Sequence, residues 1–216
     1  DSGISAVWHD ADKRFELREL PLPEMEPGAI SIRVRRTSVC GSDLHIWRGD
    51  GLDPQAEPRV PFVFGHEMMG EVAALGKGVT TDSLRRPLKE GDRIVYAYFF
   101  PCMSCYNCIR GELGACKFRM ERKPLDEWPV CNGGFAQYYY LRHQNFVFKL
   151  PDEISDDAAA PINCALAQVT EAFHIGIELS CKLNHAIDPR HYAEGSHTTG
   201  TLGIFGAAAG AAKILG

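Results

Sequence analysis

CMSCYNCIRGELGAC, residues 102–116, contains four of the eight cysteines in this chain of 216 residues. The four are Cys102, Cys105, Cys108 and Cys116. Thiolates so close in sequence can surround one tetrahedral Zn²⁺ through tight turns alone, and four such ligands shield the ion from water. The spacing therefore predicts a structural zinc site.

Disulfide bonds fit this cluster less well. Eight cysteines in 216 residues fall well below the density of small secreted domains that depend on disulfides. The sequence has no basic and apolar leader ending in small residues, and pairing neighbouring Cys-x-x-Cys cysteines would strain the bond geometry. An iron–sulfur cluster is the main alternative, because cysteine runs of similar spacing also hold such clusters.

The composition limits the classes of function. Hydrophobic residues make up 45% of the chain and charged residues 24%, which is enough to form a core. The formal charge of −5 gives no basic surface for nucleic acid. The longest weakly polar stretch, residues 202–215, is too short and glycine-rich to span a bilayer as a helix. We therefore expect a cytoplasmic protein that binds neither nucleic acid nor a membrane.

Strand patterns dominate the first 150 residues. They predict a hairpin over 4–20 and strands over 30–39, 64–79, 93–100, 133–141 and 145–150. Glycines within 64–79 predict bends or bulges, as at the corners of a small barrel, and the cysteine-rich stretch is expected to be an irregular loop. At Ser155 a capping side chain precedes Asp156 and Asp157, which predicts a helix through about Phe173.

Two motifs further upstream supply a second set of candidate metal ligands. They read CGSDLH at 40–45 and GHE at 65–67, and they provide a thiolate, an imidazole and a carboxylate. Cys164, on the later helix, can add another thiolate. Because a catalytic zinc keeps three protein ligands and one open position, this set predicts a second zinc site. Taken alone, Cys40 or Cys164 is more simply a small buried hydrophobic residue.

Residues 1 to about 173 resemble the GroES-like catalytic domain of medium-chain zinc-dependent alcohol dehydrogenases. The matching segments are CGSDLH at 40–45, GHEMMGEVAALGKGV at 65–79, GDRIV at 91–95, the cysteine stretch at 102–116, GGFAQY at 133–138 and PINCALAQVTEAF at 161–173. The resemblance implies a mainly β fold with α structure (α+β), a partly open β-barrel with a structural zinc lobe. It also implies oxidation of a small alcohol to an aldehyde or ketone with NAD or NADP, and it permits a homo-oligomer.

The same resemblance implies the ligands of the catalytic zinc. Cys40, His66 and Cys164 match the three protein ligands of the family. Glu67 follows the histidine and can approach the metal or replace its water. Together with the four-cysteine stretch, these residues imply two zinc ions per chain.

Two further residues match the proton path of the family. Ser42 matches the hydroxyl that takes the alcohol proton, and His45 matches the relay that passes the proton toward solvent. Zinc as a Lewis acid lowers the pKa of the alcohol before hydride moves to the nicotinamide. Since Ser42 and His45 are three residues apart, a hydroxyl–imidazole chain can connect them. A solvated loop histidine is the alternative for His45, and Asp43 receives no role.

The nucleotide-binding part of such an enzyme is not recognisable in this sequence. Its signature is a strand, then Gly-x-Gly-x-x-Gly opening a helix, with an acidic residue about twenty positions later. The nearest segment, TLGIFGAAAG at 201–210, has the wrong glycine spacing. We therefore expect no complete Rossmann domain here, and little or no hydride transfer from these 216 residues alone.

The C-terminal part, from about Gly176, resembles another family. HYAEGSHTTGT at 191–201 and the alanine-rich stretch after it resemble a segment of the largely helical 2-methylcitrate dehydratase and cis-aconitate decarboxylase family. His197 would match an active-site histidine, whereas Ser196 stands where an aromatic residue is expected. The sequence thus divides into a domain at 1–173 and a helical appendage at 174–216, as a gene fusion, an assembly error or a deliberate chimera would produce.

Two other functions compete with the dehydrogenase interpretation. The chain can be a non-catalytic zinc-binding module whose exposed apolar surface associates with itself or with a partner. The tail can be a remnant of a dehydratase-like lyase, although the partners of His197 would come from parts of that fold which this sequence does not contain. Cys131 and Cys181 receive no role and are predicted to be ordinary thiols.

Overall fold

The computed structural model of the protein describes residues 2–50, 61–98, 100–118, 133–142, 146–166, 170, 173–175, 177–179, 182 and 208–209. The chain divides into two compact units, Asp1–Asn163 and Cys164–Gly216. The strands and helices named below all lie in the first unit. The predicted family boundary at residue 173 is not tested by this division and stays a prediction.

The first unit consists mainly of strands, with a few short helices. In chain order its elements are β1 (Ser2–His9), β2 (Arg14–Pro21), β3 (Ile30–Ser38), α1 (Gly41–Arg48), β4 (Phe62–Val63), β5 (Glu67–Leu75), β6 (Arg93–Tyr96), α2 (Tyr106–Ile109), η1 (Leu113–Ala115), β7 (Tyr138–Leu141), β8 (Val147–Lys149), α3 (Asp156–Ala159) and η2 (Ala160–Asn163). The content confirms the predicted mainly β fold with α structure, and the β1–β2 pair confirms the predicted hairpin.

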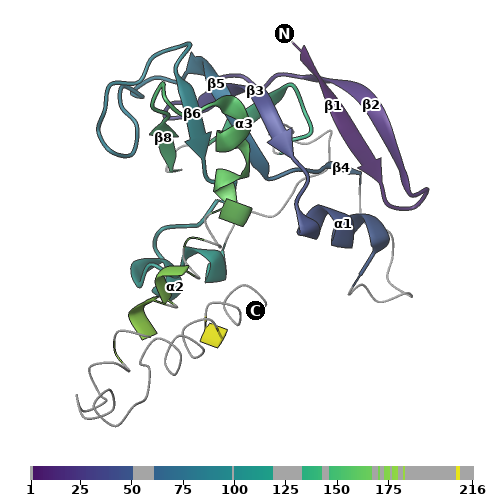
Figure 1. Ribbon diagram of the computed structural model, residues 1–216. Helices are drawn as coiled ribbons and strands as arrows, with labels where there is room; N and C mark the ends of the chain where they lie inside the picture. Colours follow the sequence, from purple (N-terminus) through teal and green to yellow (C-terminus); the bar gives the residue numbers. More distant parts are fainter. Residues whose placement is uncertain are drawn as a thin grey trace. The chain divides into compact units, whose positions relative to one another are not determined.

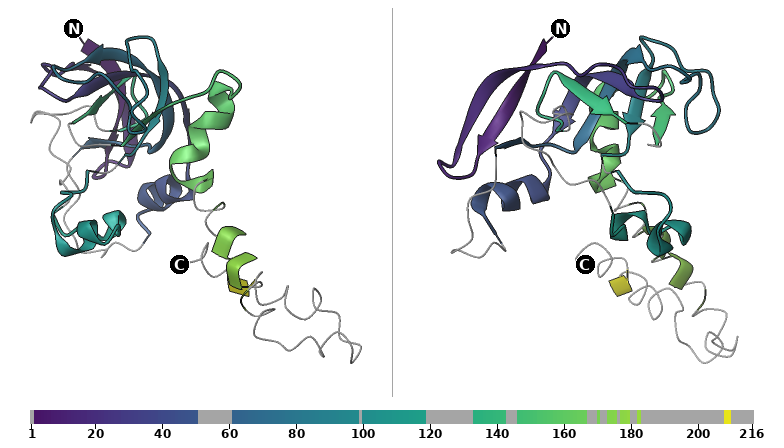
Figure 2. Two further views of the ribbon diagram at one scale, coloured as in Figure 1. Left: turned by 90° about the vertical axis from the view of Figure 1, so that its left-hand side faces the viewer. Right: turned by 180° about the vertical axis from the view of Figure 1, so that it is seen from behind.

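Two antiparallel sheets form the unit, with strand orders β2-β1-β4 and β7-β3-β5-β6-β8. The segment just before β7 links them. Ala6 of β1 donates a backbone hydrogen bond to the Phe135 carbonyl at 2.8 Å, and Val34 of β3 donates one to the Gln137 carbonyl at 2.9 Å. Within the described residues the strands curl without closing into a barrel, as Figure 1 and both views of Figure 2 show. The prediction of a partly open barrel is therefore confirmed.

The larger sheet carries the main hydrophobic core. Ile32 on β3, Met68 and Val72 on β5, and Ile94 on β6 are at most 1% exposed and pack in one cluster. Successive side chains on a strand point to opposite faces, so the alternating sequence pattern places one face inward. Burying each of these side chains stabilises the fold by roughly 1.5–3 kcal/mol.

A bulge bends the β3–β5 pair. The register shifts between Val34 and Arg36, and Gly70 of β5 lies opposite Val34. A Cβ at Gly70 would lie 2.6 Å from the Arg33 carbonyl oxygen and would also clash with Ile32 Cγ2. The glycine is therefore required for the close approach of the two strands, which agrees with the bulge predicted from the glycine pattern.

Several local predictions differ from the structure. Helix α1 follows β3 directly, although the sequence pattern gave no helix there. The stretch 102–116 is not wholly irregular, because it contains the helical turns α2 and η1. Strands β6 and β7 are shorter than the predicted ranges 93–100 and 133–141.

The helix expected from Ser155 begins as predicted, but it does not continue as an α-helix. Ser155 Oγ accepts a hydrogen bond from the Ala158 backbone N–H at 3.2 Å, which confirms the cap. The α-helix gives way after Ala159 to the 3₁₀ turn η2. Pro161 explains the change, because proline has no N–H to donate and its ring crowds the carbonyl four residues earlier.

In the part of the chain that the structure describes, every helix is too short or too polar to cross a bilayer. The predictions for Cys131, Cys181, Ser196 and His197 fall on residues outside the described ranges, and so does most of the segment 201–210.

Gly70→Ala is expected to lower the free energy of unfolding by about 1–3 kcal/mol, because the added methyl group overpacks β3. Gly41→Ala is the matched control, since a Cβ there meets nothing within 4 Å and alanine favours a helix by about 0.5–1 kcal/mol over glycine. Urea unfolding of both variants at one zinc concentration measures the two changes. Equal stability of the two variants would contradict the close packing at Gly70.

Candidate metal centres

The four cysteines of the 102–116 stretch come together at one point. Their Sγ atoms all lie within 4.8 Å of one another. The separations are 3.5 Å for Cys105–Cys108 and 3.9 Å for both Cys102–Cys108 and Cys105–Cys116. Four sulfurs bound at about 2.3 Å from one Zn²⁺ stand about 3.8 Å apart, at the corners of a tetrahedron. The observed separations therefore fit a single ion.

The same distances argue against disulfide bonds and against an iron–sulfur cluster. All four cysteines are free thiols, and their sulfurs lie much farther apart than the roughly 2.05 Å of a disulfide bond. A multi-iron cluster places its own iron and sulfide atoms among the cysteine sulfurs, so it needs wider separations. A single tetrahedral ion is the arrangement that remains.

Short helical turns and backbone N–H bonds to sulfur hold the four-cysteine lobe, residues 102–116, together. Cys105 is the N-cap of α2, and η1 turns the chain back so that Cys116 can reach the other sulfurs. The Cys105 backbone N–H donates to Cys102 Sγ, and the Cys102 backbone N–H donates to Cys116 Sγ, each at 3.3 Å. Asn107 ties the two turns together, because its Nδ2 donates to the Ala115 carbonyl at 2.6 Å.

The protein environment affects the four thiols unequally. Hydrogen bonds from Ser104 lower the pKa of Cys102 to about 6. Burial and the neighbouring thiols raise the pKa of Cys108 to about 12. Four thiolates at these distances repel one another, and a divalent cation among them removes the repulsion. The donor set thus fits a bound metal.

Cys40 and His66 lie at one edge of the larger sheet. Ser38, the last residue of β3, pairs with Glu67, the first residue of β5. Cys40 therefore follows one strand end and His66 precedes the neighbouring strand. Cys40 Sγ and a ring nitrogen of His66 lie within 4.8 Å of each other. The structure thus brings together two of the predicted ligands.

Gly65 sets the direction in which the chain enters β5. Its φ of 94° lies in the region that favours glycine, and a Cβ there would lie 2.8 Å from the Phe135 backbone nitrogen. The turn points His66 inward, where its side chain is 12% exposed. The imidazole packs against the ring of Tyr98, with 4.9 Å between the ring centroids.

Asp43 is the site residue that the sequence interpretation missed. It is 3% exposed, and its Oδ1 lies 3.4 Å from His66 Nδ1. Its Oδ2 accepts the Cys40 backbone N–H at 2.9 Å. Recognising α1 would have identified it, because an acidic residue at the third helical position is a known partner of the N-cap backbone.

The charges of this group are coupled. Burial by itself would raise the pKa of Asp43, but hydrogen bonds from His66 and the Cys40 N–H outweigh burial and lower it. The same bond with Asp43 raises the pKa of His66. Because a carboxylate holds Nδ1, Nε2 is the nitrogen that the imidazole would present to a metal.

The three remaining predicted residues have different surroundings. Ser42 Oγ lies 3.1 Å from His66 Nε2, on the side of the ring that a metal would occupy. His45 is 66% exposed, and its Nδ1 lies 2.8 Å from Asp50 Oδ2. Glu67 is buried. The relay from Ser42 to His45 and the approach of Glu67 to a metal stay predictions.

Cys164 begins the second compact unit, so its membership in the ligand set also stays a prediction. Asn163, the residue before it, belongs to the first unit. Its Nδ2 donates hydrogen bonds to the Met68 carbonyl at 2.8 Å and to the His66 carbonyl at 3.3 Å.

Sequence comparison reveals the family. The family model of the alcohol dehydrogenase GroES-like domain matches residues 26–152, which include Cys40, His66 and the four-cysteine lobe. The chain belongs to this family of oxidoreductase domains. The predicted resemblance is therefore confirmed, and the two cysteine-containing motifs are parts of a GroES-like domain.

Known relatives of the GroES-like domain are longer than this chain. L-threonine 3-dehydrogenase of Francisella tularensis subsp. tularensis (strain WY96-3418) is 36% identical over 144 residues, which are 67% of this chain and 37% of the relative. A Thermotoga maritima alcohol dehydrogenase structure has a TM-score of 0.69 at 26% identity, covering 81% of this chain and 47% of that one. Acetophenone reductase from Geotrichum candidum, solved with NAD, has a TM-score of 0.61 at 29% identity over 80% and 47% of the two chains.

The tail matches a second family. The family model of the MmgE/PrpD N-terminal domain matches residues 154–216, which confirms the predicted resemblance of the tail to a dehydratase family. This match also includes residues 154–173, which the sequence resemblance had assigned to the GroES-like domain.

Cys102→Ser is expected to remove one metal ion per chain, because the lobe then offers only three thiolates. Cys131→Ser is the control, since Cys131 is predicted to be an ordinary thiol and should leave the metal content unchanged. Elemental analysis of the purified chain gives the metal-to-protein ratio. The same ratio in both variants would contradict a metal site in the lobe.

Asp43→Asn is expected to weaken metal binding at the Cys40–His66 edge by about 10–100-fold, the usual effect of losing a partner that orients a histidine ligand. Binding at the four-cysteine lobe should not change. Asp50→Asn is the matched control, because it removes a carboxylate from the exposed His45 instead. Competition with a coloured chelator measures both affinities, and equal effects of the two substitutions would exclude the orienting role.

Proposed function

We propose that this chain is the zinc-binding catalytic domain of an alcohol dehydrogenase, which oxidises a small alcohol to an aldehyde or ketone with NAD or NADP. The observation that carries the proposal is the arrangement around His66. A buried carboxylate, Asp43, holds one ring nitrogen, while the other faces the Ser42 hydroxyl. The similarity to L-threonine 3-dehydrogenases makes the secondary alcohol of an amino acid one candidate substrate.

Two zinc ions belong to the proposed domain. The four-cysteine lobe holds a structural ion, and Cys40, His66 and Cys164 hold a catalytic ion with Glu67 close to it. When bound, the catalytic zinc supplies a Lewis acid that lowers the pKa of an alcohol hydroxyl. The protein contributes the orientation of the ligands, chiefly through the Asp43–His66 contact.

Ser42 and His45 move the proton in this proposal. Once His66 Nε2 serves as a ligand, the Ser42 hydroxyl, 3.1 Å away, is available to accept the alcohol proton. Ser42 and His45 are three residues apart on α1, so they share one face of the helix. His45 is exposed and paired with Asp50, which suits a group that releases a proton to solvent.

The role of Cys164 separates two interpretations of residues 154–173. If this segment belongs to the GroES-like domain, Cys164 is the third ligand. If it belongs to the dehydratase-like tail that matches 154–216, Cys164 is an ordinary thiol. The bonds of Asn163 to the carbonyls of His66 and Met68 support the first interpretation.

A non-catalytic zinc-binding module is the second candidate. Tyr106, Ile109 and Phe118 of the cysteine lobe are 70–76% exposed. Exposed apolar residues in one lobe favour association with a partner or a second copy of the chain. This candidate needs the structural zinc but neither the catalytic zinc nor a cofactor. A lyase role for the tail through His197 has no support from the described residues.

The purified 216-residue chain is expected to bind two zinc ions and, by itself, to transfer little or no hydride, because it carries no recognisable nucleotide-binding signature. Cys164→Ser should leave one zinc ion, whereas the control Cys181→Ser should leave two. Elemental analysis and an NAD(P)H absorbance assay with simple alcohols and L-threonine measure both properties. One zinc ion in the unaltered chain would favour the module, and steady turnover would overturn the expected inactivity.

A further inference from the structure

We propose that Asn163 is a positioning residue for the catalytic metal site. Its amide holds the backbone that carries His66, and Asn163 is the residue directly before Cys164 in the chain. The inference rests on the proposed function, because it takes Cys164 as a ligand of the catalytic zinc.

The amide of Asn163 uses both of its donors on the beginning of β5. Nδ2 donates to the Met68 carbonyl at 2.8 Å and to the His66 carbonyl at 3.3 Å. An asparagine amide has two N–H groups, so its donors are satisfied by these two carbonyls. His66 and Met68 are alternate residues, which places their carbonyls on the same side of the extended chain.

Cys164 is attached to this anchor by one peptide bond. Consecutive Cα atoms are about 3.8 Å apart across a trans peptide. The anchor therefore holds the residue that immediately precedes the proposed ligand Cys164. Because the two bonds also restrain the backbone of His66, they reduce the conformational entropy that metal binding at its imidazole must remove.

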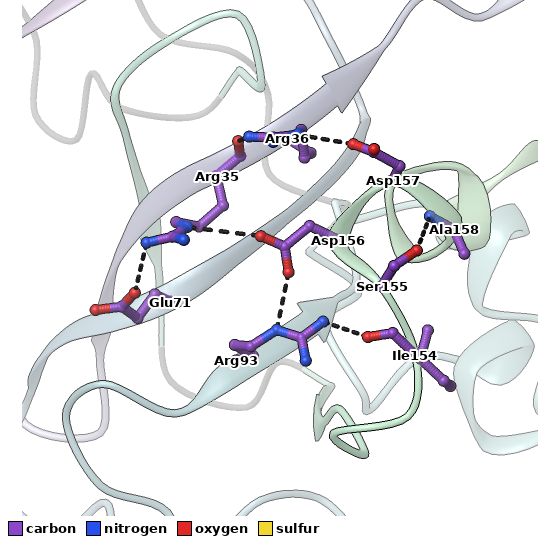
Figure 3. Close-up of polar contacts among 9 residues, drawn as sticks. All are labelled: Arg35, Arg36, Glu71, Arg93, Ile154, Ser155, Asp156, Asp157 and Ala158. Atoms are coloured by element: carbon purple, nitrogen blue, oxygen red, sulfur yellow. Dashed lines mark hydrogen bonds and ion pairs between the residues drawn. The ribbon is translucent and has the colours of Figure 1, made fainter.

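Ion pairs hold the start of α3, which leads along the chain to Asn163, against the larger sheet (Figure 3). Arg93 Nε of β6 lies 2.8 Å from Asp156, and Arg35 of β3 lies 3.6 Å from the same carboxylate. Arg36 lies 2.8 Å from Asp157. The first turn of α3 is thus joined to two strands of the larger sheet, and η2 extends from that fixed point to Asn163.

These ion pairs differ in how strongly they stabilise the position of α3, because they differ in solvent exposure. Arg36 and Asp157 are 55% and 81% exposed, so solvent screens their attraction and the pair contributes little to stability. Arg93 and Asp156 are 26% and 19% exposed, and Arg93 also donates to the Ile154 carbonyl. The Arg93–Asp156 pair is therefore the main polar contact of α3, supported by the fully buried Ala159.

The experiment compares Asn163→Ala with Asn107→Ala. Asn107 is the matched control, because its amide also donates to a backbone carbonyl, that of Ala115, but in the four-cysteine lobe. Cobalt(II) replaces zinc in each chain, and the sulfur-to-cobalt absorption distinguishes a site with four thiolates from one with two thiolates and an imidazole. Asn163→Ala should weaken cobalt binding at the second site about tenfold or more, and Asn107→Ala should weaken only the four-cysteine site.

The outcomes separate the inference from the proposed function. If Cys164→Ser leaves both absorption spectra unchanged, Cys164 is not a ligand and the proposed function fails. If Cys164→Ser removes the second spectrum but Asn163→Ala leaves its affinity unchanged, only the positioning role fails. The four-cysteine spectrum reports folding in the same molecule, and its loss in Asn163→Ala would overturn positioning in favour of a general structural role. Asp156→Asn weakens the ion pairs that hold the start of α3. It should therefore lower the cobalt affinity of the second site by less than Asn163→Ala does, and it should leave the four-cysteine site unchanged.

Discussion

The antiparallel register of β3 and β5 is the constraint on which the meeting of Cys40 and His66 depends. Ser38 faces Glu67, so the chain leaves β3 where it enters β5, and Cys40 and His66 meet at that edge. A register shift of one residue would turn the side chains of β5 to the opposite face. The bulge opposite Gly70 and the buried residues Met68 and Val72 fix this register. The core of the fold therefore determines which potential ligands are neighbours.

Asp43 connects the local structure of α1 to the orientation of the imidazole. One carboxylate oxygen receives the backbone N–H of Cys40 at the start of the helix, and the other faces His66 Nδ1. The same buried group thus fixes the backbone that carries the thiol and the ring that carries Nε2. Its burial costs free energy, and hydrogen bonds offset that cost. Asp43 thus both caps α1 and contacts the imidazole of His66.

The sequence predicted the parts of the protein that depend on neighbours along the chain. The four-cysteine lobe is one such part, because its cysteines lie within fifteen residues and the turns between them are short. The β-hairpin and the Ser155 cap are others. The helix α1 was missed because its N-cap is Cys40, which is not among the usual capping residues, and Asp43 was missed with it. Asn163 was missed because its partners are about 95 residues away in sequence.

Residues 154–173 lie within the match to the tail family and also fall in the range that resembles the GroES-like domain, and two of them contact the larger sheet. Asp156 is paired with Arg93 of β6, and Asn163 is bonded to the start of β5. Both contacts lie within the first compact unit. Up to Asn163 the segment is therefore part of the first compact unit, whatever the origin of its sequence.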